Sequence, residues 1–155
     1  MGKNPVDQAT PELVKKHVEK NAVLPTLPEY VNFAKYQQSG GYQLFQDCLT
    51  GKRDAESVIS ELKNSGLRGL GGAGFPVGSK WEIVSKFPEP RLMAVNIDEG
   101  EPGTFKDRYY LESDPHRFLE GSMIAAWAVG IEEIYIYLRD EYAAAREILL
   151  REIAE

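Results

Sequence analysis

The sequence predicts an α/β fold in which a helical N-terminal arm precedes an incomplete parallel sheet. Two observations support this. Short apolar runs at residues 92–96 and 133–139 have the length and composition of β-strands, and a segment with helical spacing follows each of them. The order strand, helix, strand, helix indicates parallel strands joined by crossover connections. With 155 residues, 43% of them hydrophobic, the chain has enough apolar material for one packed core.

The first part of the chain is predicted to be helical. Helices are expected at residues 11–19, in a short stretch after Tyr30, at 43–49 and at 54–63. Asp54 is a typical N-cap for the last of these, and Gly66 is a typical C-terminal stop. We therefore divide the chain near Asn64 into an N-terminal arm, residues 1–64, and the beginning of an α/β domain, residues 65–155.

The second part alternates strands and helices. Its expected elements are a helix at 80–86, a buried strand at 92–96, a helix over 115–129, a strand at 133–139 and a helix at 141–153. Asp114 and Pro115 are suited to begin the central helix, and Gly130 is suited to end it. We expect Trp81, Trp127 and Phe118 in the core, because apolar aromatic side chains at helical spacing usually face a sheet.

Composition and charge exclude several functions. A net charge of −6 provides no positive potential for nucleic acid. The longest apolar run, residues 123–129, is too short for a transmembrane segment, and the N-terminus has no apolar signal core, so a cytoplasmic chain is expected. Cys48 is the only cysteine, so this chain alone cannot bind an iron–sulfur cluster through several cysteines.

Residues 66–78 form a stretch with six glycines directly ahead of Lys80. Glycine allows positive φ angles and lets backbone N–H groups approach an anion, so the stretch is suited to holding a phosphate or a flat ring. No strand precedes it and the order Gly-Lys-Ser/Thr is missing, which argues against the Rossmann fingerprint and the P-loop. A plain structural connection is the alternative.

An acidic loop follows the first predicted strand, in the sequence Asn96-Ile-Asp-Glu-Gly-Glu-Pro-Gly103. Ligands of open α/β sheets bind at the carboxyl ends of strands. Carboxylates there repel phosphate but accept hydrogen bonds from hydroxyl or amide groups, so we expect sugar, ribityl or nicotinamide contacts here and phosphate contact at Lys80. A solvated acidic turn and a cation site at Asp98, Glu99 and Glu101 are the alternatives.

The two histidines are expected to lie outside any catalytic site. His116 falls in the first turn after Pro115, where a surface or capping role is predicted, and His17 lies in the arm. Phe75, between glycine and proline, is expected to project from its loop.

Three motifs in order resemble the NADH-binding flavoprotein subunit family of respiratory complex I: residues 69–81, 96–108 and 114–121. The sequences Arg-Gly-Leu-Gly-Gly and Val-Asn-Ile-Asp are most similar to those of the beta (flavoprotein) subunit of NAD-dependent formate dehydrogenase. The resemblance covers about residues 55–155, the N-terminal portion of such subunits. Family members continue into the rest of the flavin pocket, a ubiquitin-like domain and a domain that binds a 4Fe–4S cluster.

The resemblance implies a set of cofactor contacts. By this analogy the residues that contact FMN are Gly69, Gly71, Gly72, Lys80, Asn96, Asp98 and Glu99. Phe75 would stack on the adenine of NAD(H), and Glu101 would hydrogen-bond its nicotinamide end. The chain departs from the family at Leu70, where complex I members usually carry Arg, and at Ile83, where some carry an aromatic residue.

The resemblance also implies partners: NAD(H) and the other subunits of a dehydrogenase, among them an iron–sulfur subunit. The expected activity is hydride transfer between NAD(H) and FMN with onward transfer to iron–sulfur clusters. Two alternatives remain: a truncated nucleotide-binding module without redox activity by itself, and an enzyme that binds phosphate esters with Mg²⁺ through Lys80 and the acidic loop.

Overall fold

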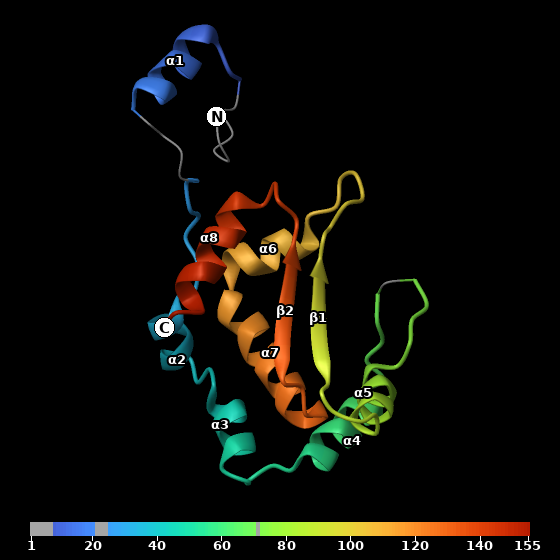
Figure 1. The fold of residues 1–155 in the computed structure, drawn as a ribbon. Helices are drawn as coiled ribbons and strands as arrows, with labels where there is room; N and C mark the ends of the chain where they lie inside the picture. Colours follow the sequence, from blue (N-terminus) through green and yellow to red (C-terminus); the bar gives the residue numbers. More distant parts are fainter. Residues whose placement is uncertain (1–7, 21–24, 71) are drawn as a thin grey trace.

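The computed structural model describes residues 8–20, 25–70 and 72–155 and confirms the α/β fold (Figure 1). The elements in chain order are α1 (Pro11–Glu19), α2 (Phe33–Gln38), α3 (Gln43–Leu49), α4 (Ala55–Ser65), α5 (Val77–Ser85), β1 (Leu92–Ile97), α6 (Lys106–Ser113), α7 (Pro115–Val129), β2 (Glu133–Leu138) and α8 (Ala143–Glu152). None of the helices in these ranges combines the length and hydropathy of a membrane span.

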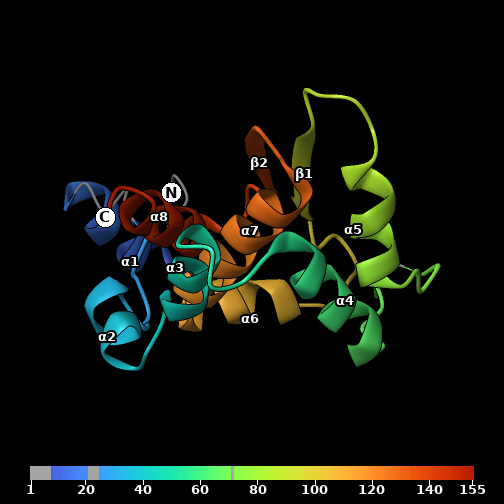
Figure 2. The same ribbon diagram turned by 90° about the horizontal axis from the view of Figure 1, so that it is seen from below.

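The sheet in the described part of the chain consists of β1 and β2, which pair in parallel with Leu92 opposite Glu133 and Ile97 opposite Leu138. Helices α6 and α7 connect the two strands, as a parallel pair requires. Seen from below, α6, α7 and α8 lie on one face of the sheet, and no described helix covers the other (Figure 2). The prediction of an incomplete parallel sheet is therefore confirmed.

The core lies between the covered face of the sheet and the helices. Its members are Ile97, Leu111, Tyr142, Ala145 and Leu149, with Val95, Phe118, Leu119, Ile136 and Leu138 packed against them. The prediction of a buried strand at 92–96 is wrong for one face of β1, because Leu92 is 57% exposed. On the same face of β2, Tyr135 and Tyr137 are 55% and 62% exposed. The alternation follows from a sheet with one covered face.

Local capping chemistry sets most helix ends as predicted. The side chains of Thr10, Asp54 and Asp114 each accept a backbone hydrogen bond in the first turn of α1, α4 and α7. Gly66 and Gly130 end α4 and α7 with φ angles of 69° and 71°, which residues with a Cβ rarely adopt. These signals are short-range, which is why the sequence predicts them correctly.

Helices α5 and α8 begin at other residues than predicted, and α6 was not predicted. Helix α5 begins at Val77, three residues before Lys80, because Pro76 with φ −62° starts the helix. Helix α8 begins at Ala143 instead of 141. Helix α6 is absent from the predicted elements; its sequence is polar, Leu111 is its one buried residue, and it has no capping side chain of its own.

The prediction of a surface or capping role for His116 is wrong, because this side chain is fully buried (0% exposed). Asp114 provides the cap of α7, while His116 points toward residues 30–45. Its Nδ1 hydrogen-bonds the hydroxyl of Tyr42 at 2.7 Å and its Nε2 hydrogen-bonds Glu152 at 2.7 Å. These two hydrogen bonds join α7, α8 and the segment before α3, and no local sequence pattern predicts them.

Two buried glutamates complete this contact between residues 30–45 and the helices. Glu152 accepts hydrogen bonds from the Tyr30 hydroxyl at 2.7 Å and from the Phe33 amide at 3.1 Å. Glu120 in α7 accepts from the Tyr36 hydroxyl at 2.6 Å. We call these groups, with His116, the buried carboxylate cluster. They hold the segment around α2 and α3 on α7 and α8; the division of the chain near Asn64 stays a prediction.

The carboxylate of Glu152 is expected to make stability depend on acidity. Burial acts to raise its pKa, but the hydrogen bonds from Tyr30, His116 and Phe33 outweigh burial and hold the pKa of Glu152 below its usual value. A carboxylate with a lowered folded-state pKa contributes stability above the unfolded pKa of about 4.3, and this contribution is lost as the pH falls through the folded value. We expect the unfolding free energy to decline below about pH 4, with a shallower decline in Glu152→Gln. Denaturant titrations of both proteins from pH 6 to 3 measure this; equal slopes contradict it.

Candidate functional site

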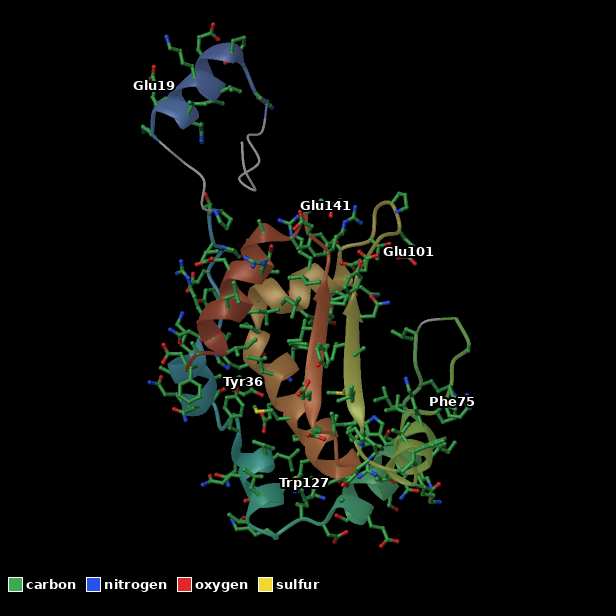
Figure 3. All side chains as sticks on the ribbon, viewed as in Figure 1. Glu19, Tyr36, Phe75, Glu101, Trp127 and Glu141 are labelled. Carbon is green, nitrogen blue, oxygen red and sulfur yellow. The ribbon has the colours of Figure 1, made fainter. Side chains whose placement is uncertain are left out.

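The acidic loop, residues 98–105, extends beyond the carboxyl end of β1 and leads into α6 (Figure 1). The Asn96 side chain accepts a hydrogen bond from the Asp98 amide at 3.0 Å, which turns the chain as it leaves the strand. Asp98 and Glu101 are exposed, and Glu101 lies on the outer side of the loop (Figure 3). The loop therefore presents two carboxylates to solvent at the end of the sheet where ligands of α/β proteins bind.

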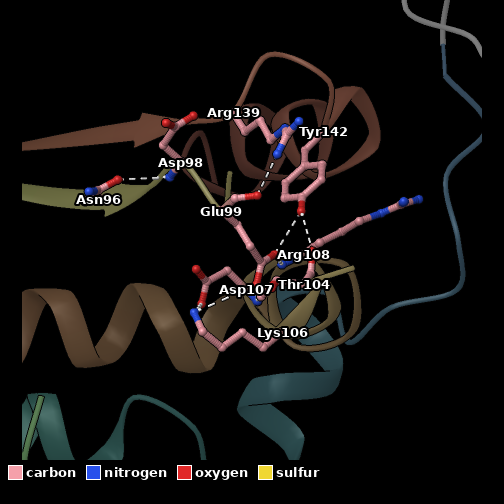
Figure 4. Close-up of polar contacts among 9 residues, drawn as sticks. All are labelled: Asn96, Asp98, Glu99, Thr104, Lys106, Asp107, Arg108, Arg139 and Tyr142. Carbon is pink, nitrogen blue, oxygen red and sulfur yellow. Dashed lines mark hydrogen bonds and ion pairs between the residues drawn. The ribbon is translucent and has the colours of Figure 1, made fainter. Parts of the chain in front are cut away.

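Glu99 points the opposite way, into the protein (Figure 4). Its side chain accepts hydrogen bonds from the amides of Asp107 at 2.9 Å and Arg108 at 3.3 Å, and from the Tyr142 hydroxyl at 2.9 Å. Glu99 thus caps α6, the helix without a capping residue of its own. Burial acts to raise the pKa of Glu99, but these hydrogen bonds and Lys106 nearby lower it below its usual value.

The glycine-rich loop connects α4 and α5 (Figure 1). Its two ends are held together because the Gly69 amide donates to the Phe75 carbonyl at 3.0 Å and the Val77 amide donates to the Leu67 carbonyl at 2.9 Å. Gly72 and Gly74 have φ angles of 95° and 60°. A Cβ would strain both positions, so glycine is required at the turn itself. Gly71 lies outside the described residues.

Lys80 lies in the first half of α5 and is exposed. It makes no ion pair or side-chain hydrogen bond with any residue that the structure describes, so its charge is available to an anion. Phe75 is 49% exposed, in agreement with the expected projection from its loop. Pro76 caps α5 without a side-chain hydrogen bond, which leaves the first turn of this helix suited to an anionic group.

Gly78 has a different role from the other glycines of the stretch. It is buried at the contact of α4 and α5, where an added Cβ would lie 2.5 Å from the backbone nitrogen of Lys63. Gly78 therefore serves helix packing. The six glycines of the stretch thus include residues required by the turn and at least one required by helix packing.

The structure places the candidate residues in two segments. Asn96 at the end of β1 adjoins Asp98 and Glu101 of the acidic loop, while Gly69, Gly72, Phe75 and Lys80 belong to the glycine-rich loop and the start of α5. Within the described residues, no hydrogen bond or ion pair joins the two segments. No group of three or more His, Cys, Asp or Glu side chains in the same ranges is placed to hold a metal ion.

Arg139 and Tyr142 are two further residues at the site that were not among the predicted site residues. Nη1 of Arg139 donates to the Glu99 carbonyl at 2.7 Å, and Tyr142 bonds the Glu99 carboxylate. A signal for them did exist: Arg139 is the last residue of the second predicted strand and Tyr142 lies three residues beyond it, at the same edge of the sheet as the acidic loop.

The donor set fits a phosphate-bearing nucleotide. Exposed glycine backbone, the first turn of α5 and Lys80, which has no partner among the described residues, suit a phosphate, whereas the exposed carboxylates suit hydroxyl groups. A parallel sheet with such loops, left open on one face, defines a partial Rossmann-like nucleotide-binding domain. Residues 62–155 match the model of the "Nuo51 FMN-binding domain", and the chain belongs to this family.

Several relatives are named as subunits of NADH-quinone oxidoreductase. The chain is 42% identical over 130 residues to one such protein of Rhizobium meliloti, a match that covers 83% of this chain and 31% of the relative. It is 44% identical over 128 residues to the corresponding protein of Aquifex aeolicus, covering 83% and 30%. The chain thus spans about a third of the length of these curated relatives.

A solved structure agrees with this fold. An NAD⁺-reducing [NiFe]-hydrogenase in the air-oxidised state superposes with a TM-score of 0.71 at 28% identity, covering 97% of this chain and 29% of that chain. The similarity extends over nearly the whole of the present chain, including the segment ahead of the matched family region.

Proposed function

We propose that this chain carries the FMN- and NAD(H)-binding loops of an NADH dehydrogenase or diaphorase-type flavoprotein subunit. The subunit would transfer hydride between NAD(H) and FMN and pass electrons on to iron–sulfur clusters. The observation that carries the proposal is the family match over residues 62–155, which includes both the glycine-rich loop and the acidic loop.

The FMN contacts are assigned to both loops. The assigned residues are Gly69, Gly71, Gly72, Lys80, Asn96, Asp98 and Glu99. Lys80 supports a phosphate contact because it is exposed and unpaired among the described residues, and Asp98 supports hydroxyl contacts because its carboxylate is exposed. Glu99 supports the site from inside the protein, since its carboxylate already accepts hydrogen bonds from the Asp107 amide in α6 and from the Tyr142 hydroxyl.

The NAD(H) contacts are assigned to Phe75 and Glu101. Phe75 offers a half-exposed ring for stacking, and Glu101 offers an exposed acceptor for an amide NH₂. FMN, when bound, supplies the change from a two-electron hydride to single electrons. The chain's own contribution is to bind and orient, so no side chain is assigned as an acid or base.

We assign the larger assembly to the NAD-dependent formate dehydrogenases, with an iron–sulfur subunit among the partners and a cytoplasmic location. The sequence around Leu70 supports this branch, and Leu70 is 90% exposed in the glycine-rich loop. A native assembly that reduces NAD⁺ with formate agrees with the assignment. An assembly driven by hydrogen, or one linked to quinone, contradicts it.

A truncated nucleotide-binding module without redox activity by itself is the second candidate. It is favoured by Cys48, the single cysteine, which is buried and cannot provide a cluster site. Adding NADH to the chain loaded with FMN under anaerobic conditions separates the two candidates. Loss of the oxidised flavin absorbance supports hydride transfer by the chain, and unchanged absorbance supports the module.

Replacing Lys80 with alanine is expected to weaken FMN binding about tenfold or more, the factor that corresponds to one hydrogen bond to a charged group. Titration of the chain with FMN, followed by flavin fluorescence, measures the dissociation constant. Lys86→Ala is the matched control, because Lys86 is also exposed but lies at the other end of α5 and pairs with Glu82. Equal affinities in wild type and Lys80→Ala would remove Lys80 from the site.

A further inference from the structure

The acidic loop has one buried anchor among its eight residues. Glu99 is 5% exposed, whereas its neighbours Asp98, Gly100 and Glu101 are exposed. Because a loop with a single buried side chain has few contacts of its own, its direction depends on what holds that side chain. The contacts of Glu99 therefore decide where the exposed carboxylates point.

Two kinds of hydrogen bond hold Glu99 (Figure 4). The amides of Asp107 and Arg108 belong to α6, the helix that directly follows the loop. Their hydrogen bonds to Glu99 are therefore local and do not join the loop to more distant elements. The bonds from Tyr142 and Arg139 come from the connection between β2 and α8, and they join the loop to the rest of the fold.

Tyr142 spans both ends of the loop. Its hydroxyl lies 2.9 Å from the Glu99 carboxylate and 3.4 Å from the Thr104 carbonyl. Its ring is 9% exposed, belongs to the hydrophobic core, and is flanked by the guanidinium carbons of Arg108 and Arg139 at 5.7 Å and 5.9 Å. The ring is thus fixed by packing, and the hydroxyl is fixed with it.

We infer that the hydroxyl of Tyr142 is a positioning group, which holds the acidic loop through Glu99 and so aims Asp98 and Glu101 at their ligand without touching that ligand. The inference rests on the proposed function for the identity of the ligand. It assigns separate tasks to the two parts of one side chain: the ring contributes to the core, and the hydroxyl orients the site.

Tyr142→Phe separates these tasks because it keeps the ring and removes only the hydroxyl. Tyr110→Phe is the matched control, since Tyr110 is 62% exposed in α6 and its hydroxyl bonds to no described residue. We expect amide hydrogen exchange of Thr104, Asp107 and Arg108 to become about tenfold faster in Tyr142→Phe and to stay unchanged in Tyr110→Phe. Unchanged exchange in Tyr142→Phe overturns the inference, and this arm requires no ligand.

The second arm tests positioning in FMN binding with a double-mutant cycle between Tyr142→Phe and Asp98→Asn. If Tyr142 aims Asp98, the Asp98→Asn substitution weakens FMN binding about tenfold in the wild-type background and less than about threefold in the Tyr142→Phe background. Effects that multiply independently overturn the positioning role. A wild-type chain that does not bind FMN overturns the proposed function instead, and the exchange arm then decides whether Tyr142 holds the loop.

Discussion

Replacing Glu120 with alanine is expected to lower the free energy of unfolding by about 3 kcal/mol or more, because each donor left without a partner costs about 1 to 3 kcal/mol. The carboxylate is 8% exposed and accepts hydrogen bonds from the Tyr36 hydroxyl at 2.6 Å and from the amides of Tyr42 at 3.0 Å and Phe45 at 3.2 Å. Those amides open α3, which has no cap of its own. The denaturant midpoint and slope measure the change.

Two further variants test this explanation. Tyr36→Phe removes one donor and leaves the amides of α3 capped, so a loss of only about 1 kcal/mol is expected. Glu132→Ala removes an exposed carboxylate and is expected to change stability by less than about 0.5 kcal/mol. A Glu120→Ala protein as stable as Glu132→Ala would show that the carboxylate does not hold α3 on α7.

Gly78→Ala is expected to destabilise the protein by about 2 to 3 kcal/mol, the range typical of an overpacked core. The new methyl group would lie 2.5 Å from the Lys63 backbone nitrogen and 2.9 Å from the Leu62 carbonyl carbon, so α4 and α5 must move apart. Backbone cannot yield as a flexible side chain does. The higher helix propensity of alanine, at most about 1 kcal/mol, does not offset this cost.

Gly121→Ala is the matched control for this prediction. Gly121 also lies within a helix, α7, but an added Cβ there meets no atom within 4 Å. The same substitution is therefore expected to leave stability unchanged or to raise it by up to about 1 kcal/mol. Thermal unfolding of both variants measures the difference in stability. A Gly78→Ala protein as stable as Gly121→Ala contradicts the close contact of α4 and α5.

The elements that the sequence predicts correctly are those defined by neighbouring residues. Asp54 with Gly66, and Asp114 with Gly130, bracket α4 and α7 because caps act within one turn. Helix α6 escaped prediction because its cap, Glu99, lies in the preceding loop and its sequence has little apolar periodicity. The predicted burial of β1 is wrong for one face, because apolar composition does not indicate how many faces of a sheet are covered.

For the candidate site, the sequence predicted which segments take part but not how their side chains are oriented. Glycine density and the position of Asn96 to Gly103 after a strand identified the two loops, and the family match includes both. The inward turn of Glu99 could not be predicted, because it depends on Tyr142 far along the chain. His116 is a similar case, since its partners Tyr42 and Glu152 lie on other elements.

The uncovered face of the sheet has a consequence for the colloidal behaviour of the protein. Leu92, Tyr135 and Tyr137 lie exposed on β1 and β2, each of which has a free edge within the described part of the chain, an arrangement that favours association between molecules. A net charge of −6 opposes such contacts at neutral pH. Near the isoelectric point of about 5.1 this repulsion disappears. Dilute samples are therefore needed wherever acid unfolding is followed, so that aggregation is not mistaken for the titration of Glu152.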